Sequence, residues 1–332
     1  MLPAALHRCV AIGLLVCSLM PAAAPAQPVA APSRLPLVVD LDIGDDIDDS
    51  FALALVLSQP AFELLGISTA WGDTALRVQL VQRLLRETGH AAVPVYQGIP
   101  TTSNTGFTQA RWAAGPSGGP LPVPPGRPAG ASVDFLLQQA RQRPGQVTLL
   151  ALGPMTNLAA AIAQDLAGFR QFKQVVMMGG SVRVGYSKSD FQPPRPPDNE
   201  YNIAADPAAA RAVLASGVPI VMLPLDATAL RLDDQRRAAI FSHGSAMTDA
   251  LTLMYQQWTN ANQPWISATP TLFDVVPVAW LLRPGRCPVQ PLRIEIGDKG
   301  ETREVAGPPN VQVCLVVDKA GVLDDLMQAL LR

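Results

Sequence analysis

Short apolar runs typical of β-strands alternate along this chain with stretches rich in Ala, Leu and Gln that are typical of helices. This alternation favours a largely parallel sheet with helices on both faces. The predicted strands are Leu37–Leu41, Leu64–Ser68, Val147–Leu152, Gln174–Met178, Ile220–Leu223, Leu292–Ile296 and Val311–Val317. The predicted helices include Leu76–Thr88, Ser132–Gln142, Asn157–Ala167 and Pro207–Ser216. We therefore expect one α/β domain with a Rossmann-like, open and mostly parallel sheet.

The N-terminus is typical of an export signal. Arg8 precedes an apolar run from Val10 to Met20, and Ala24-Pro25-Ala26 has the small-residue pattern of a cleavage site. The run is too short for a permanent membrane anchor. We expect a signal peptide over 1–26, a Pro/Ala-rich leader over 27–34 and the domain over 35–332. The mature chain is then secreted or periplasmic and has no membrane partner.

Composition narrows the classes of site. The chain has 332 residues and a formal net charge of −2, which gives no indication of nucleic-acid binding. Signal cleavage leaves two cysteines, Cys287 and Cys314, as two buried thiols or one disulfide. It leaves only His90 and His243, which excludes a histidine-rich zinc site.

Six of the ten residues from Asp40 to Asp49 are aspartate, and apolar runs flank them on both sides. So many like charges beside a core repel one another unless a cation is bound. Carboxylates select a hard ion such as Ca²⁺. Helix capping could explain Asp48 and Asp49 but not Asp42. The spacing does not fit an EF-hand, while a phosphatase or glycosyltransferase remains open from the aspartates alone.

Polar segments also follow the second, third and fourth predicted strands. They are 69-TAWGDT-74, 151-ALGPMTN-157 and 177-MMGGS-181. Ligands of open α/β sheets bind at the carboxyl ends of strands, so these segments are expected to meet the aspartates at one edge.

These segments, together with Glu200-Tyr-Asn-Ile203, Asp206-Pro207 and Phe273-Asp274, stand in the order found in the calcium-dependent nucleoside hydrolases, which the chain resembles from about Leu37 onward. The resemblance implies hydrolysis of a ribonucleoside to base and ribose, with one bound Ca²⁺. It implies that Asp42 accepts a proton from the attacking water. The implied Ca²⁺ ligands are Asp42, Asp49, the main-chain carbonyl of Leu152, and Asp274; the implied substrate contacts are Asp48, Asp73, Met178, Asn199, Glu200 and Asn202.

The aspartate loop is two residues longer than the D-x-D-x-G-x-D-D of the family. Family spacing to the following strand is kept when the insertion lies at Asp45 and Asp46. The alternative register would make Asp46 a ligand.

Two residues depart from the family pattern. Asp73 replaces a common asparagine, and Phe273 stands where purine-preferring members have a protonating histidine. These departures leave two alternatives, a binding protein without turnover and a hydrolase of another riboside. The expected partners are a nucleoside and, as an open alternative, further copies of the chain in a dimer or tetramer. The residues that would either stack on a base or belong to the core are Trp112, Trp258, Trp265 and Tyr255.

Overall fold

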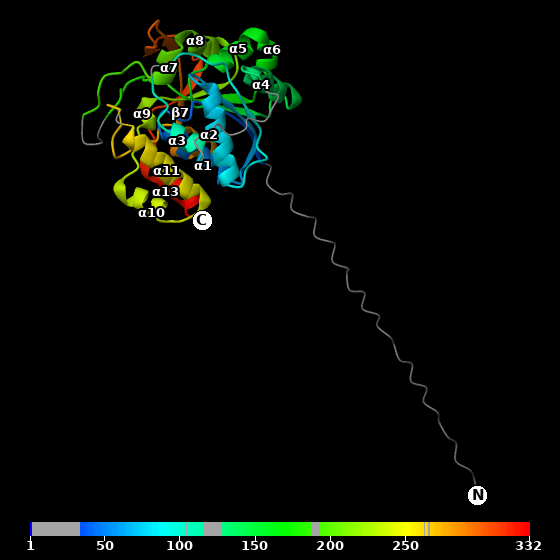
Figure 1. The fold of residues 1–332 in the computed structure, drawn as a ribbon. Helices are drawn as coiled ribbons and strands as arrows, with labels where there is room; N and C mark the ends of the chain where they lie inside the picture. The colour runs from blue at the N-terminus through cyan, green and yellow to red at the C-terminus, as the bar shows by residue number, and fades with distance from the viewer. Residues whose placement is uncertain (2–33, 104, 116–127, 188–192, 262, 265) are drawn as a thin grey trace. The chain divides into compact units, whose positions relative to one another are not determined.

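A sheet of eight strands lies between two groups of helices in the computed structural model, which describes residues 1, 34–103, 105–115, 128–187, 193–261, 263–264 and 266–332 (Figure 1). The strand order is β3-β2-β1-β4-β5-β6-β10-β7, and only β7 runs antiparallel to its neighbour. The strands are β1 Leu35–Leu41, β2 Phe62–Thr69, β3 Val95–Tyr96, β4 Thr148–Ala151, β5 Gln174–Met178, β6 Ile220–Leu223, β7 Val289–Leu292 and β10 Val311–Cys314. A separate antiparallel pair consists of β8 Ile294–Ile296 and β9 Thr302–Glu304.

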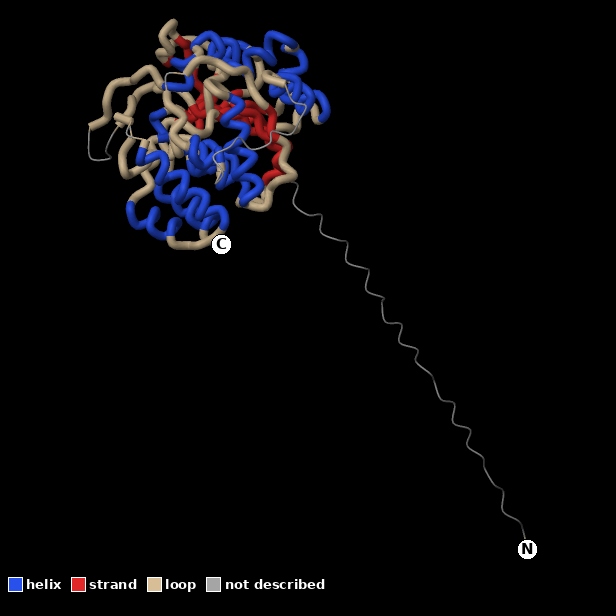
Figure 2. The backbone as a smooth tube through the Cα atoms, in the orientation of Figure 1, coloured by secondary structure: helices blue, strands red, loops and turns tan. Residues whose placement is uncertain are grey.

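Helices cover both faces of the sheet (Figure 2). They are α1 Asp48–Leu57, α2 Thr74–Glu87, α3 Ala110–Ala114, α4 Ala131–Gln142, α5 Thr156–Gln164, α6 Leu166–Phe169, α7 Tyr201–Ala205, α8 Pro207–Ala215, α9 Leu225–Thr228, α10 Asp234–Phe241, α11 Ala246–Asn260, α12 Val275–Leu282 and α13 Lys319–Leu330, with a 3₁₀ turn at Pro284–Arg286.

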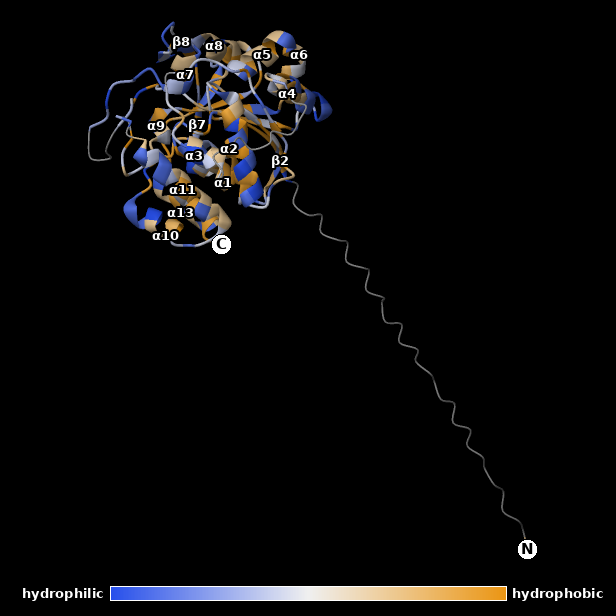
Figure 3. Cartoon of the chain, in the orientation of Figure 1, coloured by the Kyte–Doolittle hydropathy of each residue, from blue (hydrophilic) through white to orange (hydrophobic). Residues whose placement is uncertain are grey.

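Strand β1 shows why the sequence folds this way. Leu37 and Val39 pack into a core with α1, α2, α11, α12 and α13, while Val38 packs into a second core with α4, α5, α6 and α8. Side chains of a strand alternate between the two faces of the sheet, so a strand that is buried on both faces must be apolar throughout. Figure 3 shows the apolar colour concentrated on the strands and on the inner faces of the helices. The expected α/β class and mostly parallel sheet are confirmed.

Three details differ from the expected elements. Leu292–Ile296 is not one strand, because its two halves pair with different partners, β7 with β10 and β8 with β9. Asn157–Ala167 is not one helix, because Asp165 ends α5 and caps α6 by accepting the Gly168 N–H. Strand β3 has two residues, too few to produce an alternating pattern.

Cys287 and Cys314 form a disulfide that joins the segment after α12 to β10, with Cα atoms 5.7 Å apart. This supports the disulfide alternative over two free thiols. The expected signal peptide lies outside the described residues. In the part of the chain that is described, no helix is long and apolar enough to cross a bilayer.

Candidate active site

The aspartate loop connects the carboxyl end of β1 to the first turn of α1. Asp40 is still within the strand, where its carboxylate accepts hydrogen bonds from Ser68 and from Asn157. Asp48 and Asp49 begin α1, but neither caps it, since Ile47 occupies the cap position and no side chain there bonds to the helix. Capping therefore does not explain these two residues. Their carboxylates are available for another role.

Three carboxylates from opposite ends of the chain meet at this point. One ligand oxygen from each of Asp48, Asp49 and Asp274 lies within 4.8 Å of the others, and all three residues are buried. Asp274 precedes α12, and its backbone N–H donates to Asp48 at 3.3 Å. One oxygen of Asp49 and one of Asp274 are buried and have no hydrogen-bond partner. A buried oxygen without a hydrogen-bond partner destabilises the folded protein. The cluster is therefore suited to a cation, which accepts electron pairs from such oxygens.

Burial and mutual repulsion disfavour the charged forms of these carboxylates. Burial raises the pKa of Asp42 to about 7, against an opposing effect of the Arg77 charge. Burial, and then the charges of Asp42 and Asp48, raise the pKa of Asp49 well above its usual range. Burial, and then the charges of Asp48 and Asp49, do the same for Asp274. A bound cation would reverse both effects.

Arg77 of α2 fixes the shape of the aspartate loop. Its guanidinium is buried, pairs with Asp45 at 3.0 Å and donates to the carbonyl oxygens of Asp42 and Ile43. Its Nε donates to the Trp71 carbonyl at 2.8 Å. The Arg77 side chain thus joins the aspartate loop to the segment after β2. Asp45 is already neutralised by this contact and has no need of a metal ion.

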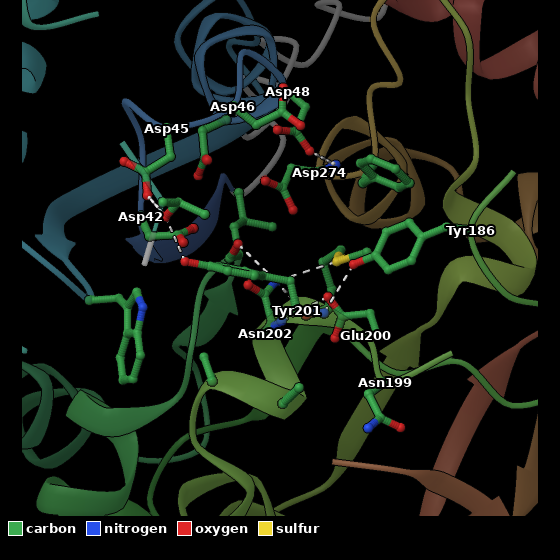
Figure 4. Close-up of a pocket in the computed structure, with 18 of the residues that line it drawn as sticks. Asp42, Asp45, Asp46, Asp48, Tyr186, Asn199, Glu200, Tyr201, Asn202 and Asp274 are labelled. Atoms are coloured by element: carbon green, nitrogen blue, oxygen red, sulfur yellow. Dashed lines mark hydrogen bonds between the residues drawn. The ribbon is translucent and has the colours of Figure 1, made fainter. Parts of the chain in front are cut away.

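A cavity of about 730 Å³ opens beside the carboxylates, within the usual size range of ligand sites. Its opposite wall comes from the end of β5 and the start of α7 (Figure 4). Glu200 caps α7 by accepting the N–H groups of Asn202 and Ile203, and it also accepts the Gly180 N–H. Burial raises the pKa of Glu200 to about 7, against the effect of these three bonds.

The carbonyl of Leu152 lies between the two walls. It follows β4 and accepts a hydrogen bond from the Asn202 side chain at 3.2 Å. The same amide nitrogen lies 3.3 Å from the Met178 carbonyl at the end of β5. The carboxyl ends of three adjacent strands therefore converge on one cavity, as the sequence indicated.

Nearly all residues expected in the site line this cavity. They are Asp42, Asp48, Asp49, Leu152, Met178, Asn199, Glu200, Asn202 and Asp274. Asp73 does not line it, because its side chain is exposed and caps α2 through the Leu76 N–H. The three-carboxylate cluster contains Asp48, which the sequence assigned to ribose, and leaves out Asp42.

Residues that sequence reasoning did not assign complete the walls. Trp71, Thr105, Tyr186 and Tyr201 line the cavity, along with Phe273. Three of the four aromatic residues considered for stacking do not line it: Trp112 and Trp258 are buried in the core, and Tyr255 packs against Phe241. The fourth, Trp265, lies outside the described residues. Trp71 belongs to the segment 69-TAWGDT-74, and this position after a strand was the one sequence feature that indicated its place in the site.

The comparisons with known proteins agree with this geometry. A model of the inosine-uridine preferring nucleoside hydrolases matches residues 37–324. The chain belongs to this family. The pyrimidine-specific ribonucleoside hydrolase RihA of Shewanella woodyi is 30% identical over 89% of this chain and 97% of its own. An uncharacterized protein of Schizosaccharomyces pombe is 30% identical over 80% of this chain and 86% of its own.

Solved structures of nucleoside hydrolases share the fold. A plant nucleoside hydrolase superposes with a TM-score of 0.77 at 21% identity, over 90% of this chain and 99% of its own. A purine-preferring ribonucleoside hydrolase of Gardnerella vaginalis superposes with a TM-score of 0.73 at 23% identity, over 89% of this chain and 98% of its own. Family membership makes the chain a hydrolase.

The raised pKa values predict how the metal-free protein responds to pH. The unfolded chain releases these protons near pH 4, whereas the folded metal-free chain holds the proton of Asp42 up to about pH 7. The free energy of unfolding without metal should therefore fall as pH rises through this window. The Tm gained on adding Ca²⁺ to chelated protein should grow from pH 5 to pH 8 in thermal unfolding scans. A gain that shrinks over this range would contradict the burial of the carboxylates.

Proposed function

We propose that this nucleoside hydrolase cleaves the N-glycosidic bond of a ribonucleoside with the help of a bound Ca²⁺. The observation that carries the proposal is the buried carboxylate cluster on the cavity wall, with unpartnered oxygens on Asp49 and Asp274. An all-oxygen set of this charge fits Ca²⁺ better than a softer ion. Asp42, Asp49, Asp274 and the Leu152 carbonyl would hold it, with Asp48 beside them. When bound, Ca²⁺ acts as a Lewis acid that makes a water molecule more acidic and fixes its direction.

Asp42 is the proposed general base. It lines the cavity, and its charge affects the pKa of Asp48, Asp49 and Asp274, so it lies close to the cluster. Arg77 donates to the Asp42 main-chain carbonyl and not to its carboxylate, which lines the cavity. The Asp42 carboxylate would accept the proton of the water that attacks the anomeric carbon.

The opposite wall would bind the sugar. Glu200 and Asn202 present polar groups to the cavity, and Met178 supplies an apolar surface under the ring. The glycosidic bond breaks with positive charge developing on the sugar, as in other glycoside cleavage. The surrounding carboxylates favour that charge electrostatically.

We also propose that the chain is exported and that residues 1–26 are removed. The disulfide between Cys287 and Cys314 supports this, because disulfides persist in oxidising compartments. N-terminal sequencing of the protein recovered from the exporting host should begin at Gln27. Recovery of the chain with Met1 intact would contradict cleavage.

The reaction is tested by incubating the mature chain with purine and pyrimidine ribonucleosides and measuring released ribose, with and without chelator. The panel includes uridine and cytidine, because relatives are named pyrimidine-specific ribonucleoside hydrolase and probable uridine nucleosidase. We expect hydrolysis of at least one member and its loss on chelation. Asp42→Asn should lower kcat by about 10²-fold or more, because it removes a general base. Full activity in chelator, or in Asp42→Asn, would contradict the mechanism.

A further inference from the structure

Tyr186 is a cavity residue for which the proposed mechanism has no role. It lies in the segment that follows β5, and its backbone N–H donates to the Asp198 carboxylate at 2.8 Å. Its ring contacts Phe273 edge-on, with centroids 5.9 Å apart and an interplanar angle of 88°. Its hydroxyl oxygen accepts the Tyr201 N–H at 3.0 Å. Backbone, ring and oxygen are therefore all fixed by neighbours.

The proton of this hydroxyl has no acceptor among the described residues. The other phenol of the cavity and the half-buried alcohol of Thr105 are already engaged: Thr105 donates to Asp45, and the Tyr201 hydroxyl bonds with Thr105 and Ser103. A hydroxyl has one donor hydrogen, and the hydrogen of this half-buried hydroxyl is left for a partner in the cavity. The lining contains no histidine, lysine or arginine among the residues described there. Tyr186 thus lines the cavity with a hydrogen-bond donor that has no acceptor among the described residues.

Figure 4 places this hydroxyl at the Glu200 and Asn202 wall, away from the end where Asp45, Asp46 and Asp48 lie. A ribose with its vicinal hydroxyls toward the metal-binding carboxylates directs its hydroxymethyl group away from them, since that group lies on the opposite face of the ring. The acceptor that arrives beside Tyr186 is then the 5′ oxygen.

We propose that Tyr186 is a specificity-determining residue that donates a hydrogen bond to the 5′-hydroxyl of the sugar, an inference that rests on the proposed function. Its preferred substrates are ribosides with an unmodified hydroxymethyl group. Glu200, close by, would repel an anionic substituent such as a phosphate at the same position. The substrate must then be supplied by a reaction that leaves this hydroxyl free, such as hydrolysis of a phosphate monoester.

The test compares wild type with Tyr186→Phe, which removes only the hydroxyl. Three substrates are needed: the best nucleoside of the panel, its 5′-deoxy analogue with the same base, and p-nitrophenyl riboside. One hydrogen bond between neutral groups corresponds to about 3- to 10-fold in kcat/KM. We expect Tyr186→Phe to lose this factor on the nucleoside and on p-nitrophenyl riboside, and to match wild type on the 5′-deoxy analogue.

Other patterns overturn the inference. Equal loss on the 5′-deoxy analogue, or no loss on any substrate, would show that the hydroxyl does not contact the 5′ oxygen. Loss on the nucleoside without loss on p-nitrophenyl riboside would assign Tyr186 to the leaving base, because nitrophenolate needs no proton. A wild type that hydrolyses none of the three overturns the proposed function as well, and this result is distinct from a change in selectivity.

Tyr255→Phe is the matched control. The Tyr255 hydroxyl donates to the Ala268 carbonyl, and the residue belongs to α11 and does not line the cavity. This variant should keep the kcat/KM of wild type on all three substrates. Wild type provides a second readout without mutation, since its kcat/KM should be lower for the 5′-deoxy analogue than for the nucleoside by at least the same factor.

Discussion

Repulsion between buried carboxylates is the constraint on which the rest of this site depends. Oxygens of Asp48, Asp49 and Asp274 within 4.8 Å of one another repel by about 3–4 kcal/mol per charged pair at an effective dielectric constant of about 20. Desolvation adds to that cost, and the raised pKa values express both effects. A protein keeps such a cluster only where something compensates it. Arg77 compensates the charge of Asp45 by pairing with it, and the cluster at α1 has no such partner among the described residues and is left for a cation.

The stability of the surrounding fold offsets the repulsion within this cluster. Strands β1, β4 and β5 are buried on both faces, and two hydrophobic cores stabilise them. Their carboxyl ends place Asp42, Leu152 and Met178 around one cavity, and α12 brings Asp274 from far along the chain. The site therefore lies at the ends of strands that are buried on both faces. The remaining walls include the segments that carry Trp71 and Tyr186.

The sequence predicted the features that leave a hydrophobic pattern or an unusual number of one residue type. Continuous apolar runs located β5 and β6 at their observed bounds, and the aspartate excess located the site. It could not predict the Arg77–Asp45 pair, because an arginine in a helix resembles a surface residue until the loop folds over it. For Asp73 the motif position favoured a substrate contact, and the sequence did not indicate that its side chain would cap α2. Tyr186 lies between the motifs that end at Ser181 and begin at Glu200, so no motif indicated a role for it.

The account is tested most directly by calorimetric titration of Ca²⁺ into the metal-free chain, with Asp49→Asn and Asp45→Asn as a matched pair. Both variants replace one carboxylate by an amide in the stretch from β1 to the first turn of α1, but only Asp49 belongs to the buried cluster, whereas Asp45 is paired with Arg77. We predict one Ca²⁺ site per chain in wild type and in Asp45→Asn, and no site in Asp49→Asn. Absence of binding in wild type, preference for Zn²⁺, or binding lost in Asp45→Asn and kept in Asp49→Asn would contradict it.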